Sequence, residues 1–115
     1  MEIVPILDND FVLRRVPSYN PSFIKPDGSV TSLAFKTKRG EDGLSVDLER
    51  FTTYEKSILD VAKFNLVRLG VGFIRSIEPL DVIHNPQVDN DAHCLIVPEV
   101  ADKQAKKMKL GCSVI

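Results

Sequence analysis

The chain has 115 residues, of which 43% are hydrophobic and 27% charged, and its formal net charge is −1. These values are typical of one globular domain and exclude a chain that is disordered throughout. The near-balance of acids and bases argues against a non-specific nucleic-acid binder, because such proteins carry a clear basic excess.

The cysteines and the chain ends indicate the compartment. Cys94 and Cys112 are too few for a disulfide framework. The first residues include an acid, Glu2, and no long apolar stretch, so we expect no signal peptide. No apolar run approaches the roughly 20 residues of a membrane-spanning helix. The sequence therefore predicts a soluble cytoplasmic protein with reduced thiols. Its end, Cys112-Ser113-Val114-Ile115, matches a prenylation box, but the pattern is short enough to arise by chance.

Three segments in the first half favour strands. They span residues 9–16, 30–37 and 44–48. Pro17 ends the first, because proline removes a donor from the ladder, and Asp27-Gly28 is a turn signal before the second. The third alternates with period two, which predicts one buried and one open face. We expect Leu44, Val46 and Leu48 to be more buried than Ser45 and Asp47.

The clearest helix is expected at about residues 52–69. Thr52 and Glu55 have the spacing of a capping box, and Gly70 suits the position just past a helix end. An apolar face at helical spacing supports this helix. Its members are Tyr54, Ile58, Val61, Ala62, Leu66 and Leu69. Of these, Tyr54, Ile58 and Ala62 are predicted to be buried against the sheet.

The second half continues with shorter elements. A strand is predicted at 71–77, a short strand or a turn of helix at 80–84, and a further strand at 92–97. Residues 99–110 contain good helix formers and predict a C-terminal helix, within a lysine-rich segment, 99–115, that could be loosely attached. The fold class that follows is a single α+β domain over residues 1–115, with a mainly antiparallel or mixed sheet and one clear helix packed on it.

His93 is a candidate general acid or base within the last predicted strand. The alternative is a hydrogen-bonded structural histidine. A metal site built from His84, His93 and Cys94 is disfavoured, because structural zinc ligands come in closely spaced pairs. We therefore expect no metal and no other cofactor. Cys94 is expected to be an inert core thiol, since burial raises the pKa of a thiol.

Arg14 and Arg15 end the first predicted strand, where adjacent side chains face opposite ways. An inward arginine would pair with Asp47 or with an anionic ligand. The alternative is two exposed arginines that protect an edge strand. At the end of the second predicted strand and in the loop after it, acidic residues closely follow a basic cluster and offset its charge, so a solvated loop is favoured over a phosphate site. These residues are Lys36, Lys38, Arg39, Glu41 and Asp42.

Five short signatures occur in order along most of the chain. They are Leu13-Arg14-Arg15, Asp27-Gly28, Ala34-Phe35, Leu44-Ser45-Val46-Asp47 and Asp89-Asn90-Asp91-Ala92-His93. In this order they resemble a group of small uncharacterised bacterial proteins. The resemblance implies no activity, but it suggests that Arg14 or Arg15, Ser45, Asp47 and His93 belong to one site. The lysine-rich tail is not part of the pattern.

Two function classes are open on this basis. The first is an accessory protein of a bacterial cytoplasm that binds another protein, in an oligomeric state that the sequence does not set. The second is a small nucleotide- or nucleic-acid-directed enzyme of a conflict system, by a distant analogy to ADP-ribosyltransferases. Its catalytic residues would be Arg15, Ser45 and His93, and its ligand-binding residues Arg14 and Asp47. Convergence of these side chains in one pocket would favour the enzyme.

Overall fold

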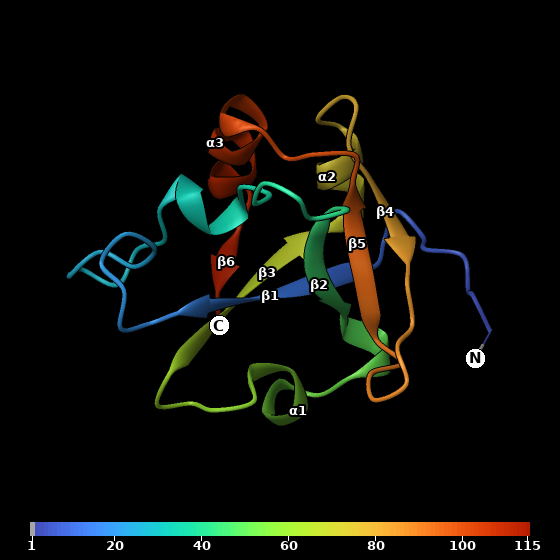
Figure 1. Cartoon of the computed structure of the whole chain (residues 1–115), viewed down its shortest axis with the longest axis horizontal. Coiled ribbons are helices and arrows are strands. Elements are labelled where there is room, and N and C mark those ends of the chain that lie inside the picture. Colours follow the sequence, from blue (N-terminus) through green and yellow to red (C-terminus); the bar gives the residue numbers. More distant parts are fainter. Residues whose placement is uncertain (1) are drawn as a thin grey trace.

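The computed structural model describes residues 2–115. Its centre is a six-stranded antiparallel sheet in the order β4-β5-β2-β1-β3-β6 (Figure 1). The strands are β1 (Phe11–Pro17), β2 (Leu44–Leu48), β3 (Phe64–Gly70), β4 (Asp81–His84), β5 (His93–Val97) and β6 (Ser113–Val114). The predicted α+β class with an antiparallel sheet is confirmed. Within the same residues, no helix has the length and apolar content that crossing a bilayer requires.

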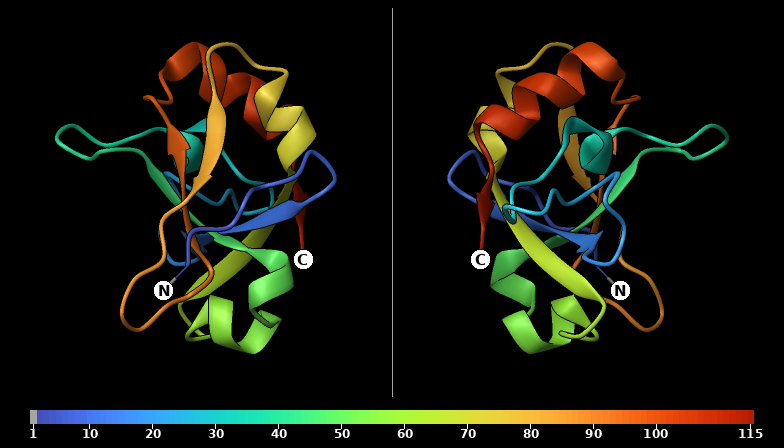
Figure 2. Two further views of the ribbon diagram at one scale, coloured as in Figure 1. Left: turned by 90° about the vertical axis from the view of Figure 1, so that its right-hand side faces the viewer. Right: turned by 90° about the vertical axis from the view of Figure 1, so that its left-hand side faces the viewer.

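Helices lie at both ends of the molecule (Figure 2). They are the 3-10 helices η1 (Ser32–Phe35) and η2 (Glu49–Phe51) and the α-helices α1 (Tyr54–Ile58), α2 (Val71–Arg75) and α3 (Asp102–Leu110). The main core forms where η1, α2 and α3 pack on one face of the sheet, and it includes Phe35, Ile74 and Met108. A second, smaller cluster packs Ile58 of α1 on Leu13 and Leu66.

Strand β2 has the predicted alternation. Leu44, Val46 and Leu48 are 1%, 3% and 0% exposed and belong to the main core. Ser45 is half-buried, in line with the prediction. Asp47 is nevertheless only 4% exposed. A carboxylate is buried to this extent only when it is hydrogen-bonded, so Asp47 has partners on the second face of the sheet.

The predicted helix over 52–69 is wrong, because the chain makes a short helix and then a central strand. α1 begins one residue later than the capping box implied: Thr53 is the N-cap, and its hydroxyl accepts the Lys56 N–H at 3.2 Å. The side chain of Asp60 then accepts the Ala62 N–H, a local bond that competes with the helical ladder. The face predicted from helical spacing therefore does not exist: Tyr54 is 41% exposed and Ala62 is also exposed.

Residues 64–70 form β3, which β1 and β6 flank. Because both faces of this strand are covered, Leu66, Val67 and Leu69 are all buried, and this near-continuous apolar run mimics one side of a helix. Gly70 ends a strand rather than a helix.

Two predicted strands are helices. Residues 71–75 form α2, whose first N–H groups bond to the carbonyls of Asp10 and Asp8. In place of a strand at 30–37, η1 turns Ala34 and Phe35 into the core. Both helices depend on contacts with distant segments, which local propensity does not register.

The C-terminal segment is part of the folded domain. The predicted C-terminal helix is confirmed as α3, which contributes Ala105 and Met108 to the main core. Val100 is also buried there, although lysines dominate the outer side of the segment. After α3, β6 pairs with β3 at the edge of the sheet.

Replacing Ile58 by alanine should lower the free energy of unfolding by about 2–5 kcal/mol, the usual cost of a cavity at a buried aliphatic site. Ile58 is 2% exposed and is what α1 contributes to the second cluster. Urea unfolding would measure the loss. Val61, three positions on and 70% exposed, is the control, since its alanine variant should change stability by less than about 0.5 kcal/mol. Equal effects of the two substitutions would contradict this packing.

Candidate functional site

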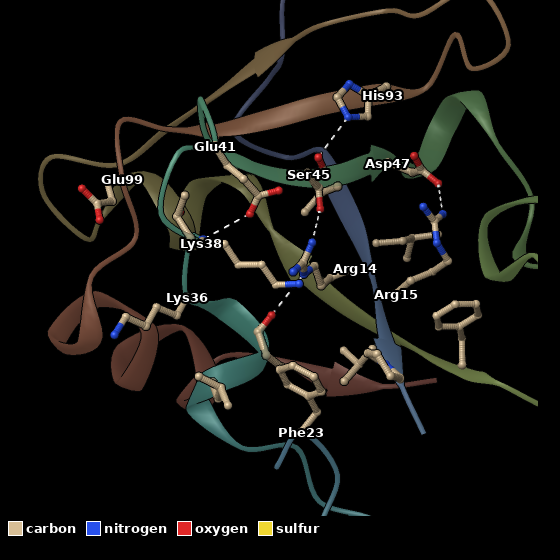
Figure 3. A pocket seen from close by; sticks show the side chains of 18 of the residues that line it. Arg14, Arg15, Phe23, Lys36, Lys38, Glu41, Ser45, Asp47, His93 and Glu99 are labelled. Atoms are coloured by element: carbon tan, nitrogen blue, oxygen red, sulfur yellow. Dashed lines mark hydrogen bonds and ion pairs between the residues drawn. The ribbon is translucent and has the colours of Figure 1, made fainter. Parts of the chain in front are cut away.

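The site lies where two neighbouring strands diverge. β1 pairs with β3 along its whole length but with β2 only through Val12–Leu48 and Leu13–Asp47. Beyond Leu13 the strands separate, and a cavity of about 900 Å³ occupies the region (Figure 3). Because the cavity opens between strands, side chains from both faces of the sheet line it. We call it the cleft.

All five residues that the sequence proposed for a site line the cleft. They are Arg14, Arg15, Ser45, Asp47 and His93. The register of β2 and β5 places Asp47 opposite His93 and Ser45 opposite Leu95, so the hydroxyl, the carboxylate and the imidazole share one face. Arg14 comes from the other face of β1, that of Val12 and Val16.

Ser45 and His93 are in direct contact, as expected. His93 Nε2 lies 3.2 Å from Ser45 Oγ, and His93 Nδ1 lies 2.9 Å from the main-chain oxygen of Asn85 and 3.1 Å from its Oδ1. A carbonyl oxygen only accepts, so Nδ1 carries the proton. In the neutral ring Nε2 then accepts from the Ser45 hydroxyl. His93 is 9% exposed, and these bonds fix its tautomer and its orientation.

Arg14 spans the gap between the diverging strands. Its Nε donates to the Ala34 carbonyl at 3.1 Å, and its Nη1 donates to the Ser45 carbonyl at 2.9 Å. The Leu48 N–H donates to the Ala92 carbonyl, on the side of β5. Because the main-chain groups of successive residues in a strand point to alternate neighbours, those of Ser45 point the other way, towards β1. Arg14 therefore takes the place of the missing strand partner.

The charge of Arg14 has no direct partner. Among residues 2–115, no carboxylate lies within ion-pair distance of its guanidinium. Burial lowers the pKa of Arg14 to about 10, and the negative charge of Glu41 opposes this shift. The guanidinium is thus a half-buried cation at neutral pH, held in the wall of a cavity by two carbonyls.

Arg15 and Asp47 satisfy each other in a separate network. Ser57 Oγ and Asn90 Nδ2 donate to the two oxygens of Asp47 at 2.7 and 2.9 Å. Arg15 Nη1 lies 3.5 Å from Asp47 Oδ2 and donates to the Ser57 carbonyl at 2.7 Å. This network ties β1 and β2 to α1 and to the loop before β5. Both oxygens of Asp47 are thus engaged, and the charge of Arg15, which bonds only through Nη1, is balanced by Asp47.

Three polar contributors to this region are not among the site residues proposed from the sequence. Asn90 lies within a signature that was noted for His93 alone, so its position was a usable signal. Asn85 contributes mainly through its backbone, and Ser57 lies within the predicted helix over 52–69. Neither has a sequence pattern that would have identified it.

The loop expected to be solvated also lines the cleft. It contributes three basic residues and one acid: Lys36, Lys38, Arg39 and Glu41. Lys36 pairs with Asp102 at 3.0 Å, and Glu41 accepts the backbone N–H of Lys38 at 3.1 Å. Together with Arg14 and Arg15, and set against Asp47 and Glu99, the lining has a positive balance.

The histidines and the buried cysteine do not form a common site. His84 is paired with Cys94 in the ladder and therefore lies on the opposite face from His93. Its ring is held by the Val4 N–H and the Asp91 carbonyl. Within residues 2–115, no three potential metal ligands are grouped together. Burial raises the pKa of Cys94 to about 12, which keeps the thiol protonated and unreactive.

The cleft therefore combines an unpaired cation, a hydroxyl bonded to an oriented imidazole, and a basic rim, beside a carboxylate network that is complete. Arg14, Ser45 with His93, and the basic rim are the groups that a ligand in the cleft would contact.

No protein-family model matches this chain, and no curated protein or solved structure matches it either.

Proposed function

We propose that the cleft binds a phosphate-bearing small molecule of the nucleotide class, and that the protein is an enzyme that acts on this ligand. The observation that carries the proposal is the half-buried charge of Arg14, which has no carboxylate partner among residues 2–115. A cation removed from water without a partner costs stability. Phosphate oxygens match the fork of a guanidinium and would supply the missing charge.

The free donors of Arg14 support this assignment. Nε and one N–H of Nη1 are bonded to backbone carbonyls, which fixes the plane of the guanidinium. Nη2 has no partner among the described residues and remains for a ligand. An arginine oriented in this way by its neighbours binds an anion without first losing side-chain entropy.

The size and lining of the cleft favour a ligand larger than phosphate. Its volume of about 900 Å³ falls in the range of sites for drug-sized molecules. Phe23 and Phe64 also line it, and aromatic rings are surfaces on which a planar base can pack. A nucleotide presents both a phosphate for Arg14 and a base for one of these rings, which belong to different clusters: Phe23 packs on the main core and Phe64 on the second cluster.

Calorimetric titration with pyrophosphate, adenosine diphosphate and adenosine tests the proposal. We expect adenosine diphosphate to bind at least about tenfold more tightly than adenosine, since hydrogen bonds to charged groups contribute about 1.5–3 kcal/mol. Affinity should also fall with added salt. If none of the three binds at millimolar concentration, the proposal fails and the alternative of a protein-binding accessory domain is favoured.

A further inference from the structure

We infer that Ser45 is the nucleophile of a phosphoryl-transfer reaction in the cleft and that His93 is its general base. The inference rests on the proposed function, to which it adds a reaction class and the role of each residue. It comes from the order of contacts Ser45–His93–Asn85, which links a hydroxyl to a base and the base to a group that orients it.

The separation of the two reacting groups fits this role. Ser45 Oγ and His93 Nε2 are 3.2 Å apart, at the upper end of the range for proton transfer, and such contacts tighten when substrate binds. The Asn85 carbonyl keeps the proton of the neutral ring on Nδ1, which leaves the Nε2 lone pair facing the hydroxyl. Asn85 is thus a positioning residue.

A second serine in the same region shows what distinguishes Ser45. Ser57 donates to the Asp47 carboxylate at 2.7 Å, is 1% exposed and is not among the residues that line the cleft. Ser45 is half-buried, lines the cleft and has an imidazole as its acceptor. Only Ser45 therefore combines a base with access to a ligand.

Arg14 places positive charge beside the same residue. Its Nη1 donates to the main-chain oxygen of Ser45 at 2.9 Å, so the guanidinium adjoins the residue that carries the nucleophile. A fixed donor of this kind stabilises the charge on the oxygens of a transferring phosphoryl group. Since both residues line the cleft, the role of Ser45 requires that a phosphate held by Arg14 extend across the cleft to Ser45 Oγ.

The reaction balances with water as the second substrate. Ser45 Oγ forms a bond to phosphorus while its proton passes to His93 Nε2, and the bond from phosphorus to the leaving oxygen breaks. That oxygen leaves on the far side of phosphorus with the electron pair and takes a proton from a water molecule there. The resulting hydroxide attacks the phosphoserine from the same side, and Ser45 regains the proton held by His93 Nε2 as the bond to Oγ breaks.

Labelling with diisopropyl fluorophosphate tests the nucleophile directly. Ser45 Oγ would bond to phosphorus, and fluoride would leave with the electron pair of its bond. We expect one label per protein, mapped to Ser45 by peptide mass spectrometry, and no label in S45A. H93Q should slow labelling at least about tenfold, and S57A should be labelled at the rate of the native protein if it folds. Label on another residue, or S45A labelled like the native protein, would overturn the inference.

Two further measurements separate this inference from the proposed function and from a purely structural contact. Pyrophosphate should bind S45A as it binds the native protein; binding without any labelling would refute the nucleophile alone. N85D places a carboxylate beside His93 Nδ1 and favours the imidazolium, so the pH midpoint of labelling should rise. An unchanged midpoint would contradict the role of His93 as base, and if S45A does not fold, H93Q and the mapped position decide.

Discussion

Replacing Asp47 by alanine should lower the free energy of unfolding by about 3–5 kcal/mol, the range seen when one member of a buried ion pair is removed. Three donors meet at this carboxylate, from Arg15, Ser57 and Asn90. Most of the loss comes from the donors left behind, since an unmet buried polar group costs about 1–3 kcal/mol. Urea unfolding followed by circular dichroism would measure it.

Asp102 is the matched control for Asp47. It also forms an ion pair, with Lys36 at 3.0 Å, but its side chain is 77% exposed, against 6% for Asp47. Exposed pairs contribute about 0–1 kcal/mol, so Asp102→Ala should be nearly neutral. If the two substitutions destabilise the protein equally, the Asp47 network does not hold the fold together in the way that its geometry implies.

Replacing Arg14 by methionine should weaken pyrophosphate binding by roughly 10- to 100-fold, which corresponds to the 1.5–3 kcal/mol of hydrogen bonds to a charged group. The same change should also lower the free energy of unfolding by about 1–3 kcal/mol, because the carbonyls of Ala34 and Ser45 lose the donor that they accept from. Binding is therefore compared at a temperature at which both proteins are folded.

Arg39 provides the control for Arg14. It lines the same cleft and carries the same charge, but it is exposed on the loop. R39M should weaken pyrophosphate binding less than about threefold at physiological salt, because exposed charges are screened. A loss of affinity as large as that of R14M would show that the whole basic rim, rather than Arg14, binds the anion.

Period-two alternation identified β2 and the faces of Ser45 and Asp47 correctly, because one side of this strand is core and the other is not. The same approach failed for β3, where both sides are covered and the pattern no longer alternates. That Ser45 and His93 share a site was suggested by the resemblance that the five signatures carry. Their contact could not be derived from the two predicted strands, because residues 45 and 93 are brought together by an antiparallel register that local sequence does not encode.

The roles of the two arginines could not be separated from the sequence. Their alternation showed only that Arg14 and Arg15 face opposite ways. Which of them lacks a carboxylate partner depends on Ser57 and Asp47, which lie more than 30 positions away and meet Arg15 only in the fold. The unpaired state of Arg14 depends in turn on β1 turning away from β2, a feature of the whole sheet.

That divergence has a mechanical consequence. The sheet consists of two three-stranded halves, β4-β5-β2 and β1-β3-β6, and within residues 2–115 the ladder joins them only at Val12–Leu48 and Leu13–Asp47. Elsewhere the distance between neighbouring strands is set by the backbone ladder, but here it is set by the reach of the Arg14 side chain. A ligand that draws the guanidinium away from the Ser45 carbonyl would release this tether and change the angle between the halves.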